Sequence, residues 1–394
     1  MTAVAALGAE SRFPQRKANV LVAAMRLQQA PMIIALVVVV VFFQLATGFF
    51  LRPQNISNLL VETVPLALIA IASAIMILMG EIDLSLGSVA GFTAALGVAS
   101  MAHLGWSWEA GLLVFVVSGI AAGALQGLIV VVGRIRSFVL TLAGYLVFYG
   151  VQLALLGPSS RIPMPTSPLS NLAFAKLPLW AALTVVALLA AILAYQAVSR
   201  WRHRAERPSR LALRLLVPVA ALVAGVCAAL YVEESGGFPL QFAILVILIL
   251  VFSFVLSRTV GGRHLYAVGG NPRAARENGI RTGLVRWTGF LVAGGLAGLA
   301  GLALATYTSG ADSTTGTGSL LLSGIGAAVI GGISLLGGRG SVWGAFCGAI
   351  LLAAVQNGLN LMALANYLIY IVQGLVVLGA LLLDANIRRK LVTQ

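Results

Sequence analysis

Apolar residues run through this chain in long blocks, and polar positions are confined to short stretches between them. A helix needs about 20 mostly apolar residues to cross the roughly 30 Å hydrocarbon core of a bilayer. The blocks lack the period-two alternation of barrel strands, so helices are the expected spanning element. The pattern predicts twelve segments, near residues 31–51, 59–79, 84–102, 110–132, 138–157, 178–198, 212–232, 240–257, 287–307, 320–336, 342–362 and 366–383.

The third and tenth segments, 84–102 and 320–336, are the weakest because they are rich in glycine and serine. Both are candidates for broken or re-entrant helices. We therefore predict an all-α polytopic membrane protein with about 10–12 transmembrane helices. Composition agrees, since 60% of the 394 residues are hydrophobic and only 9% are charged, which excludes a soluble domain.

The distribution of basic residues predicts the orientation of the chain. If all twelve segments cross and the N-terminus is inside, only Arg52, Arg161 and Lys176 of the 25 Lys and Arg residues lie outside. The positive-inside rule favours this arrangement, with both termini in the cytoplasm. The net charge of +14 is then a topology signal, and no nucleic acid is expected as a partner.

The predicted domain organisation has three parts. A basic cytoplasmic segment at 1–30 precedes a transmembrane domain at 31–384, and residues 385–394 form a cytoplasmic tail. The basic lead is too long for an ordinary signal peptide, so the first apolar run is expected to be an uncleaved anchor. Both cysteines lie in apolar stretches and indicate neither a disulfide framework nor a metal site.

Two inner loops carry most of the charge, and they differ in kind. The arginine run "SRWRHRAERPSR" at 199–210 has no capping pattern, which favours a topology anchor at anionic membrane lipid. The loop at about 258–286 contains "NPRAARENG", in which Asn271 suits an N-cap, Pro272 the first helical position and Gly279 the position after the C-cap. These residues predict a helix of about two turns, roughly 10 Å long.

A helix this short is marginal alone in water, so either it docks on another surface or it is an ordinary capped loop. Ala274 and Ala275 would keep part of its surface smooth. Arg273, Arg276 and Glu277 would suit a wet, polar partner.

The stretch "GEIDLS" places two carboxylates where one apolar segment gives way to the next. Charges inside a bilayer cost roughly 2.5–3.5 kcal/mol each and usually face a cavity or a partner. The predicted topology puts Glu81 and Asp83 near the inner surface, where this cost shrinks. Two interpretations stay open from the residues alone: a functional polar break between the two apolar segments, and an inner turn capped by Asp83 and Ser85.

Three stretches resemble motifs of ATP-binding-cassette importer permeases of the ribose/xylose-type sugar branch. The glycine-rich "AAVIGGISLLGGRGSVWGA" at 327–345 is one, and "GEIDLSLGS" at 80–88 resembles the family motif G-x-I-D-L-S-x-G. The coupling pattern G-G-N-x-x-A-A-R-x-x-G-I is matched at Gly269, Gly270, Asn271, Ala274, Ala275, Arg276, Gly279 and Ile280.

The resemblance covers roughly residues 55–384, and within the branch the chain is most similar to xylose-type permeases. Those also carry Glu before I-D-L-S and an extra hydrophobic region, here about 178–232. Asn278 departs from the pattern, because relatives commonly have a small serine there. This departure bears on the identity of the matching ATPase partner and leaves the class unchanged.

The resemblance implies a permease subunit that translocates a monosaccharide, D-xylose or a similar pentose, into the cytoplasm across the bacterial plasma (inner) membrane. Its implied partners are a second permease copy forming a homodimer, a cytoplasmic ATP-binding-cassette ATPase and an extracytoplasmic sugar-binding protein. The chain has no G-x-x-x-x-G-K-[ST] phosphate loop, so ATP hydrolysis is expected on a separate subunit. No catalytic residue, metal or cofactor is assigned. The implied coupling residues are Asn271, Pro272, Ala274, Ala275, Arg276, Glu277, Gly279 and Ile280.

A neutral sugar needs hydrogen bonds and stacking surfaces along its path. Polar residues in the predicted spans also include Thr141, Gln152 and Gln373, and an interhelical hydrogen bond explains any single one of them equally simply. The predicted path residues are Glu81, Asp83, Ser85, Gln126, Tyr145, Gln356, Asn357 and Asn360, of which the last three share a helical stripe by their spacing.

The ionisable residues also bear on two other classes of membrane protein, intramembrane enzymes and secondary transporters. An intramembrane enzyme is not expected, because the three histidines all fall in or beside loops. An ion-coupled secondary transporter would use ionisable groups within the spans, which are nearly free of them apart from Glu62 and the "GEIDLS" pair. A permease for branched-chain amino acids stays open as the alternative within the importer class.

The ninth segment contains four glycines at small-residue spacing, Gly294, Gly295, Gly298 and Gly301. Small residues let the backbones of neighbouring helices approach closely in a membrane. We therefore predict close helix packing along this segment.

Overall fold

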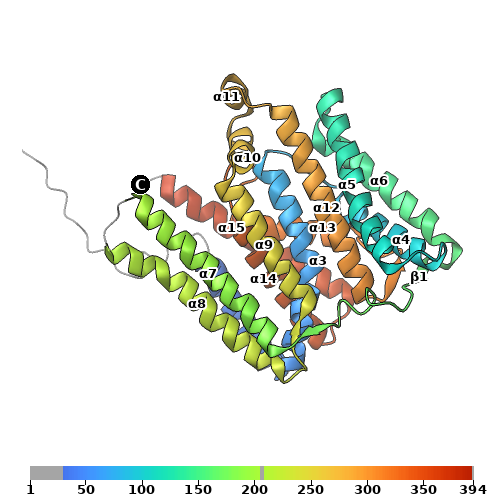
Figure 1. Cartoon of the computed structure of the whole chain (residues 1–394), viewed down its shortest axis with the longest axis horizontal. Coiled ribbons are helices and arrows are strands. Elements are labelled where there is room, and N and C mark those ends of the chain that lie inside the picture. The colour runs from blue at the N-terminus through green and yellow to red at the C-terminus, as the bar shows by residue number, and fades with distance from the viewer. Residues whose placement is uncertain (1–29, 205–207, 393–394) are drawn as a thin grey trace, which may run out of the picture.

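Helices make up most of the part of the chain that the computed structural model describes, residues 30–204 and 208–392 (Figure 1). In chain order the elements are α2 (Ala30–Thr47), α3 (Pro53–Leu78), α4 (Leu86–Ala102), α5 (Trp108–Gly133), α6 (Ser137–Leu156), the 3-10 helix η1 (Gly157–Ser159), β1 (Arg161–Pro163), β2 (Lys176–Leu177), α7 (Leu179–Arg204), α8 (Pro208–Glu233), β3 (Phe238–Pro239), α9 (Leu240–Arg258), α10 (Val260–Gly270), α11 (Pro272–Glu277), α12 (Thr282–Tyr307), β4 (Gly310–Asp312), α13 (Gly318–Ile330), α14 (Val342–Leu361) and α15 (Asn366–Val392).

Each of the twelve predicted apolar segments overlaps one helix, so the all-α polytopic architecture is confirmed. Within the described ranges, α3, α5, α6, α9, α12 and α14 are long and apolar enough to cross a membrane. The two weakest segments form α4 and α13, with 17 and 13 residues. At 1.5 Å per residue these helices reach only about 26 Å and about 20 Å, short of a full straight crossing.

The ends of the chain add little to the predicted domain organisation. The basic segment predicted at 1–30 lies almost wholly outside the described residues. At the other end, α15 runs on to Val392 without a break at the boundary predicted after residue 384.

Helix α3 forms the centre of the bundle, and α9, α12, α13 and α14 pack around it. Its side chains are apolar on nearly every face, as expected for a membrane helix surrounded by others. Ile69, Ile71 and Met76 are among the largest fully buried side chains. The extra hydrophobic region at about 178–232 forms the hairpin of α7 and α8 at the periphery (Figure 1).

Glycines let α12 and α5 approach until their backbones touch. A Cβ atom on Gly294 would collide with the carbonyl oxygen of Gly119, and one on Gly119 would collide with the carbonyl oxygen of Gly294. A Cβ on Gly298 would likewise meet the backbone of Phe115. The close packing predicted for this segment is confirmed, and it fixes α12 in the interior.

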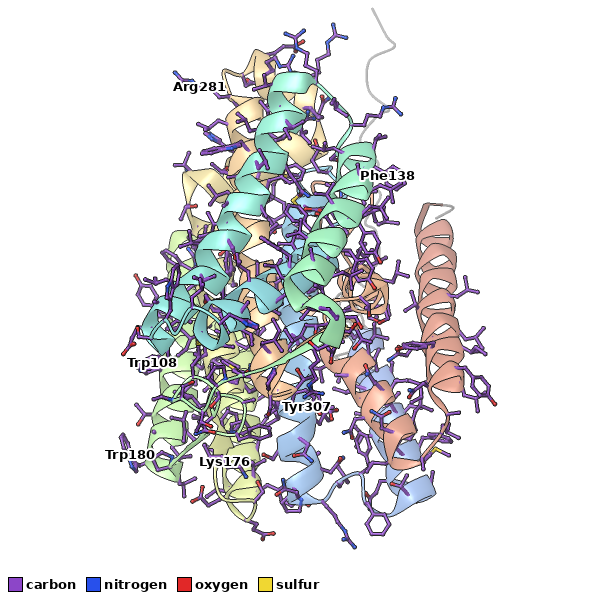
Figure 2. The ribbon with its side chains drawn as sticks, turned by 90° about the vertical axis from the view of Figure 1, so that its right-hand side faces the viewer. Trp108, Phe138, Lys176, Trp180, Arg281 and Tyr307 are labelled. Carbon is purple, nitrogen blue, oxygen red and sulfur yellow. The ribbon has the colours of Figure 1, made fainter. Side chains whose placement is uncertain are left out.

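Two short antiparallel ribbons, β1 with β4 and β2 with β3, join loops at the end of the bundle opposite α11. Figure 2 shows Arg281 near one end and Lys176 near the other. Tyr307, the last residue of α12, lies far from Arg281, which directly precedes this helix. With 26 residues, α12 is about 39 Å long and connects both ends of the molecule.

We expect Gly294→Ala to destabilise the protein by about 1–3 kcal/mol, because its methyl group overpacks a backbone contact. The matched control is Gly150→Ala in α6, where an added Cβ meets nothing within 4 Å. This change should be neutral or stabilise by about 0.5–1 kcal/mol through helix propensity. Thermal unfolding in detergent measures both, and equal stability of the two variants would contradict the close approach.

Candidate functional site

A pair of short helices, α10 and α11, projects beyond the bundle between α9 and α12 (Figure 1). The sequence predicted one helix in this loop, and the structure contains two. Helix α10 was missed because four of its eleven residues are glycine, which has a low helix propensity. Thr259 caps α10, since its hydroxyl accepts a hydrogen bond from the N–H of Gly262 at 3.2 Å.

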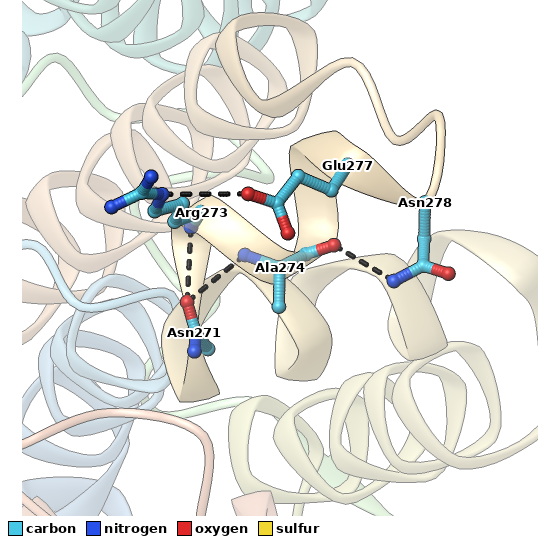
Figure 3. Close-up of polar contacts among 5 residues, drawn as sticks. All are labelled: Asn271, Arg273, Ala274, Glu277 and Asn278. Atoms are coloured by element: carbon cyan, nitrogen blue, oxygen red, sulfur yellow. Dashed lines mark hydrogen bonds and ion pairs between the residues drawn. The ribbon is translucent and has the colours of Figure 1, made fainter.

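Helix α11 begins and ends at the residues that the sequence predicts. Asn271 Oδ1 accepts hydrogen bonds from the N–H groups of Arg273 and Ala274 at 3.1 and 3.0 Å (Figure 3). At the other end, Gly279 has φ +81° and donates its N–H to the carbonyl of Arg276. The next N–H, from Ile280, reaches back to the carbonyl of Ala275, which completes a Schellman motif.

The open face of α11 is polar. Arg273 and Glu277 form an ion pair at 3.4 Å, and both side chains are largely exposed (Figure 3). Asn278, the residue that departs from the family pattern, donates from Nδ2 to the carbonyl of Ala274 at 2.9 Å and so helps to end the helix. Ala275, one of the two alanines predicted to keep part of the helix surface smooth, is only 5% exposed and faces the protein.

Four glycines bring two loops and the last turn of α10 into backbone contact, and we call this cluster the glycine junction: Gly80, Gly269, Gly337 and Gly338. The N–H of Gly338 donates to the carbonyl of Leu78 at 2.9 Å. A Cβ on Gly269 would collide with that same carbonyl oxygen, and a Cβ on Gly337 would lie 2.6 Å from the oxygen of Gly269. All three stretches that resemble family motifs therefore meet at one place.

A tyrosine from α10 adds a side-chain contact to the glycine junction. The hydroxyl of Tyr266 donates to the carbonyl of Gly340 at 2.9 Å. Burial raises the pKa of this hydroxyl, so it stays protonated and remains a donor. The α10 helix is thereby fixed to the loop that precedes α14.

The connector between α3 and α4 carries the "GEIDLS" residues, and α6 holds its backbone. Ser137 Oγ accepts from the N–H of Ile82 at 3.3 Å, and Thr141 Oγ1 accepts from the N–H of Leu84 at 3.0 Å. Thr141, one of the polar residues in the predicted spans, therefore has a structural role in this conformation.

Asp83 is buried in this connector and turns the chain into α4. Its Oδ1 accepts hydrogen bonds from the N–H and the hydroxyl of Ser85, at 2.8 and 2.6 Å. Burial raises the pKa of Asp83 to about 6, although the hydrogen bonds from Ser85 act in the opposite direction. Asp83 thus stabilises a turn ahead of α4, while the N-cap residue Ser85 makes no side-chain capping hydrogen bond to the helix.

Glu81 links the connector to the helix that follows α11. Its Oε1 lies 2.8 Å from Nε of Arg286, which belongs to the second turn of α12. The Glu81 side chain is 9% exposed and that of Arg286 34%, so the pair is partly shielded from water. A movement of α11 that displaces the start of α12 therefore also acts on the connector.

The other predicted path residues divide between packing contacts and a cavity. Gln126 accepts a hydrogen bond from the Ser85 hydroxyl at 3.0 Å, and both side chains are buried. Tyr145 lies half-buried and stacks on Tyr149, with ring centroids 6.2 Å apart. Gln152, from the wider polar set, donates to two backbone carbonyls of the loop around β4.

A cavity of about 300 Å³ lies between α3, α12, α13, α14 and α15, toward the end opposite α11. Of the predicted path residues on α14, Gln356 and Asn360 line this cavity, whereas Asn357 is buried and does not line it. The sequence missed the two tyrosines and undervalued Glu62, a carboxylate in a helix that is otherwise almost wholly apolar beyond its first turns. Polar lining residues are Glu62, Tyr307, Ser319, Ser323, Gln356, Asn360, Tyr370 and Gln373.

A bundle of membrane-length helices, an open cavity with a polar lining and a capped helix projecting from one end define a membrane transport permease. The chain belongs to the family described as branched-chain amino acid transport system / permease component, which matches residues 55–381.

The chain resembles permeases with several named substrates. The xylose transport system permease protein of Escherichia coli (strain K12) is 33% identical over 377 residues, which cover 93% of this chain and 94% of that protein. The autoinducer 2 import system permease protein of Enterobacter sp. (strain 638) is 32% identical, covering 87% of this chain and 82% of that one. For the ribose import permease protein of Escherichia coli (strain K12) the identity is 29%, with 91% and 94% covered. No solved structure shows significant similarity to this chain.

The Glu81–Arg286 pair yields a quantitative prediction. A double-mutant cycle with Glu81→Gln and Arg286→Gln, measured by unfolding in detergent, should give a coupling free energy of about 1–3 kcal/mol, because burial reduces screening. The exposed Arg273–Glu277 pair is the internal control and should give at most about 0.5 kcal/mol. A coupling no larger than that of the control would show that the buried pair does not tie the connector to α12.

Proposed function

We propose that this chain is the membrane-spanning permease subunit of an ATP-driven, binding-protein-dependent importer that carries a pentose, D-xylose or a close relative, into the cytoplasm. A separate ATPase subunit hydrolyses ATP, and a separate extracytoplasmic protein delivers the sugar. Two copies of the permease form the transport path. The chain lies in the bacterial plasma (inner) membrane with α11 and both termini on the cytoplasmic side, as the basic residues favour.

One observation carries this proposal: α11 lies between α10, whose Gly269 belongs to the glycine junction, and α12, which begins after a four-residue turn. A short helix with both ends capped and a charged open face is built for docking on a polar partner. Because the glycines of the junction are in backbone contact, a push on α11 is expected to move α12 and the adjoining loops together as a rigid body.

The coupling residues divide by role. Pro272, Arg276 and Glu277 are exposed and supply the surface that meets the ATPase, while Asn271 and Gly279 set the ends of the helix. Ala274, Ala275 and Ile280 take part in the turn geometry, and Ala275 also packs inward.

The relatives support a sugar as the substrate. Two relatives that share about one third of their residues with this chain are named for xylose and for autoinducer 2 transport. Ribose permeases have slightly lower identity. Branched-chain amino acids are named in the description of the broad family. An ion-coupled mechanism has less support, because the buried carboxylates Glu81 and Asp83 are engaged in an ion pair and a turn.

Changing the end of α11 should uncouple ATP hydrolysis from transport. Gly279→Ala places a side chain at φ +81°, which costs about 1–3 kcal/mol and reorients the helix. ATP-dependent uptake should fall about tenfold or more while membrane insertion stays normal. We expect the same result for Ala275→Asp. Gly261→Ala in α10, where the nearest atom is 3.7 Å away, is the matched control and should transport normally. Normal uptake by the Gly279 and Ala275 variants would remove the coupling assignment.

Reconstitution tests the whole proposal. Proteoliposomes containing this chain, its ATPase and its binding protein should accumulate labelled D-xylose only with internal ATP and with all three components present. Labelled ribose and leucine, measured in parallel, rank the substrates. Uptake by this chain alone under an ion gradient, or preference for leucine, would contradict the proposal.

A further inference from the structure

Glu62 is the central polar group of the 300 Å³ cavity, which we call the Glu62 cavity. Its Oε1 accepts a hydrogen bond from the hydroxyl of Tyr307 at 2.9 Å, and its Oε2 accepts one from Nδ2 of Asn357 at 3.2 Å. Asn357 is itself held by Asn55, which donates to its Oδ1 at 2.9 Å. The carboxylate is thus fixed in position by two helices, and each of its oxygens retains capacity to accept a further hydrogen bond.

The facing wall of the Glu62 cavity carries a pair of amides. Gln373 on α15 donates from Nε2 to Oε1 of Gln356 on α14 at 3.2 Å. Asn360 lies one helical turn beyond Gln356 and also lines the cavity. Amide groups both donate and accept, so this wall complements a ligand rich in hydroxyl groups.

The charge of the lining discriminates between ligand classes. Its polar members are one carboxylate, three amides, two serines and two tyrosines, and the lining contains no Lys, Arg or His. The carboxylate of an amino acid would find no cation here and would be repelled by Glu62. Sugar hydroxyls instead donate to a carboxylate, and the rings of Tyr307 and Tyr370 offer flat surfaces to the C–H face of a sugar.

We propose that the Glu62 cavity is a binding site for a single neutral monosaccharide within the permease, with Glu62 accepting hydrogen bonds from its hydroxyl groups. This inference rests on the proposed function and adds the site and its ligand class. Tyr307 ends α12, and α12 begins four residues after α11, so the same helix connects the site of the ATPase contact with the sugar site. Displacement of α12 would separate Tyr307 from Glu62 and change the cavity.

Two substitutions test the site in the reconstituted importer. Glu62→Gln keeps the size of the side chain and removes its charge, and Tyr370→Ala removes one ring. Each should lower D-xylose uptake about tenfold, the effect expected for a charge-assisted hydrogen bond or a stacking surface. ATPase stimulation by the binding protein should stay within about twofold of the unaltered protein, because α11 and the glycine junction are untouched.

The matched controls are Glu109→Gln and Tyr367→Ala. Glu109 is an exposed carboxylate at the start of α5, and Tyr367 is an exposed tyrosine one turn before Tyr370; neither lines the Glu62 cavity. Both controls should transport as the unaltered protein does. Uptake that is equally normal in the Glu62 and Tyr370 variants would overturn the site while leaving the proposed function intact.

Chemical protection tests binding without any transport. In a chain with Cys227→Ser and Cys347→Ala, the variant Ser323→Cys places a thiol in the lining, and Leu322→Cys places one on the exposed neighbour as control. Millimolar D-xylose should slow maleimide labelling at position 323 and not at 322, and leucine should slow neither. Protection by leucine, or equal labelling at 323 with and without sugar, would overturn the proposal. Failure of the proposed function alone would appear instead as absent uptake by the unaltered importer.

Discussion

Backbone contact at the glycine junction is the constraint on which the rest of the structure depends. Lipid is as apolar as a leucine side chain, so membrane helices gain little from the hydrophobic effect and need close packing and hydrogen bonds. At the junction, Leu78, Gly269 and Gly338 achieve both, since their backbones touch and share a hydrogen bond. The same device recurs where α12 meets α5. A structure fixed by backbone contact has no side chains that can yield, so displacement of one loop displaces its neighbours.

Helix α12 connects the region of the glycine junction with the Glu62 cavity. It begins directly after α11, forms the Arg286–Glu81 pair in its second turn and ends at Tyr307 beside the Glu62 cavity. A continuous helix transmits displacement along its axis without loss, unlike a chain of flexible side chains. In the proposed importer, the energy of ATP closure at α11 would therefore reach the sugar site through one element. The glycines on α12 let its backbone lie against that of α5.

Polar residues within the bundle either bond to other protein groups or line a cavity. The sequence alone did not show which residue does which. Asp83 and Gln126 occupy buried positions where each has a protein partner, and they stabilise a turn and a helix contact. Gln356 and Asn360 line a cavity, although they are of the same chemical type as Gln126. Helical spacing placed Asn357 on the same stripe, but its side chain points to Asn55 and Glu62 instead. Whether an amide meets a partner or a cavity depends on neighbours that are hundreds of residues away in the sequence.

The sequence by itself determined the elements of this protein, because the causes are local. Runs of apolar residues predict helices whatever surrounds them, and Asn271, Pro272 and Gly279 define α11 through hydrogen bonds within nine residues. Only the tertiary structure decided which elements meet. It brought three separate glycine-rich stretches into one junction, turned Ala275 inward, and assembled the Glu62 cavity from five helices. Such contacts arise from the close packing of a whole bundle, and no window of the sequence contains that information.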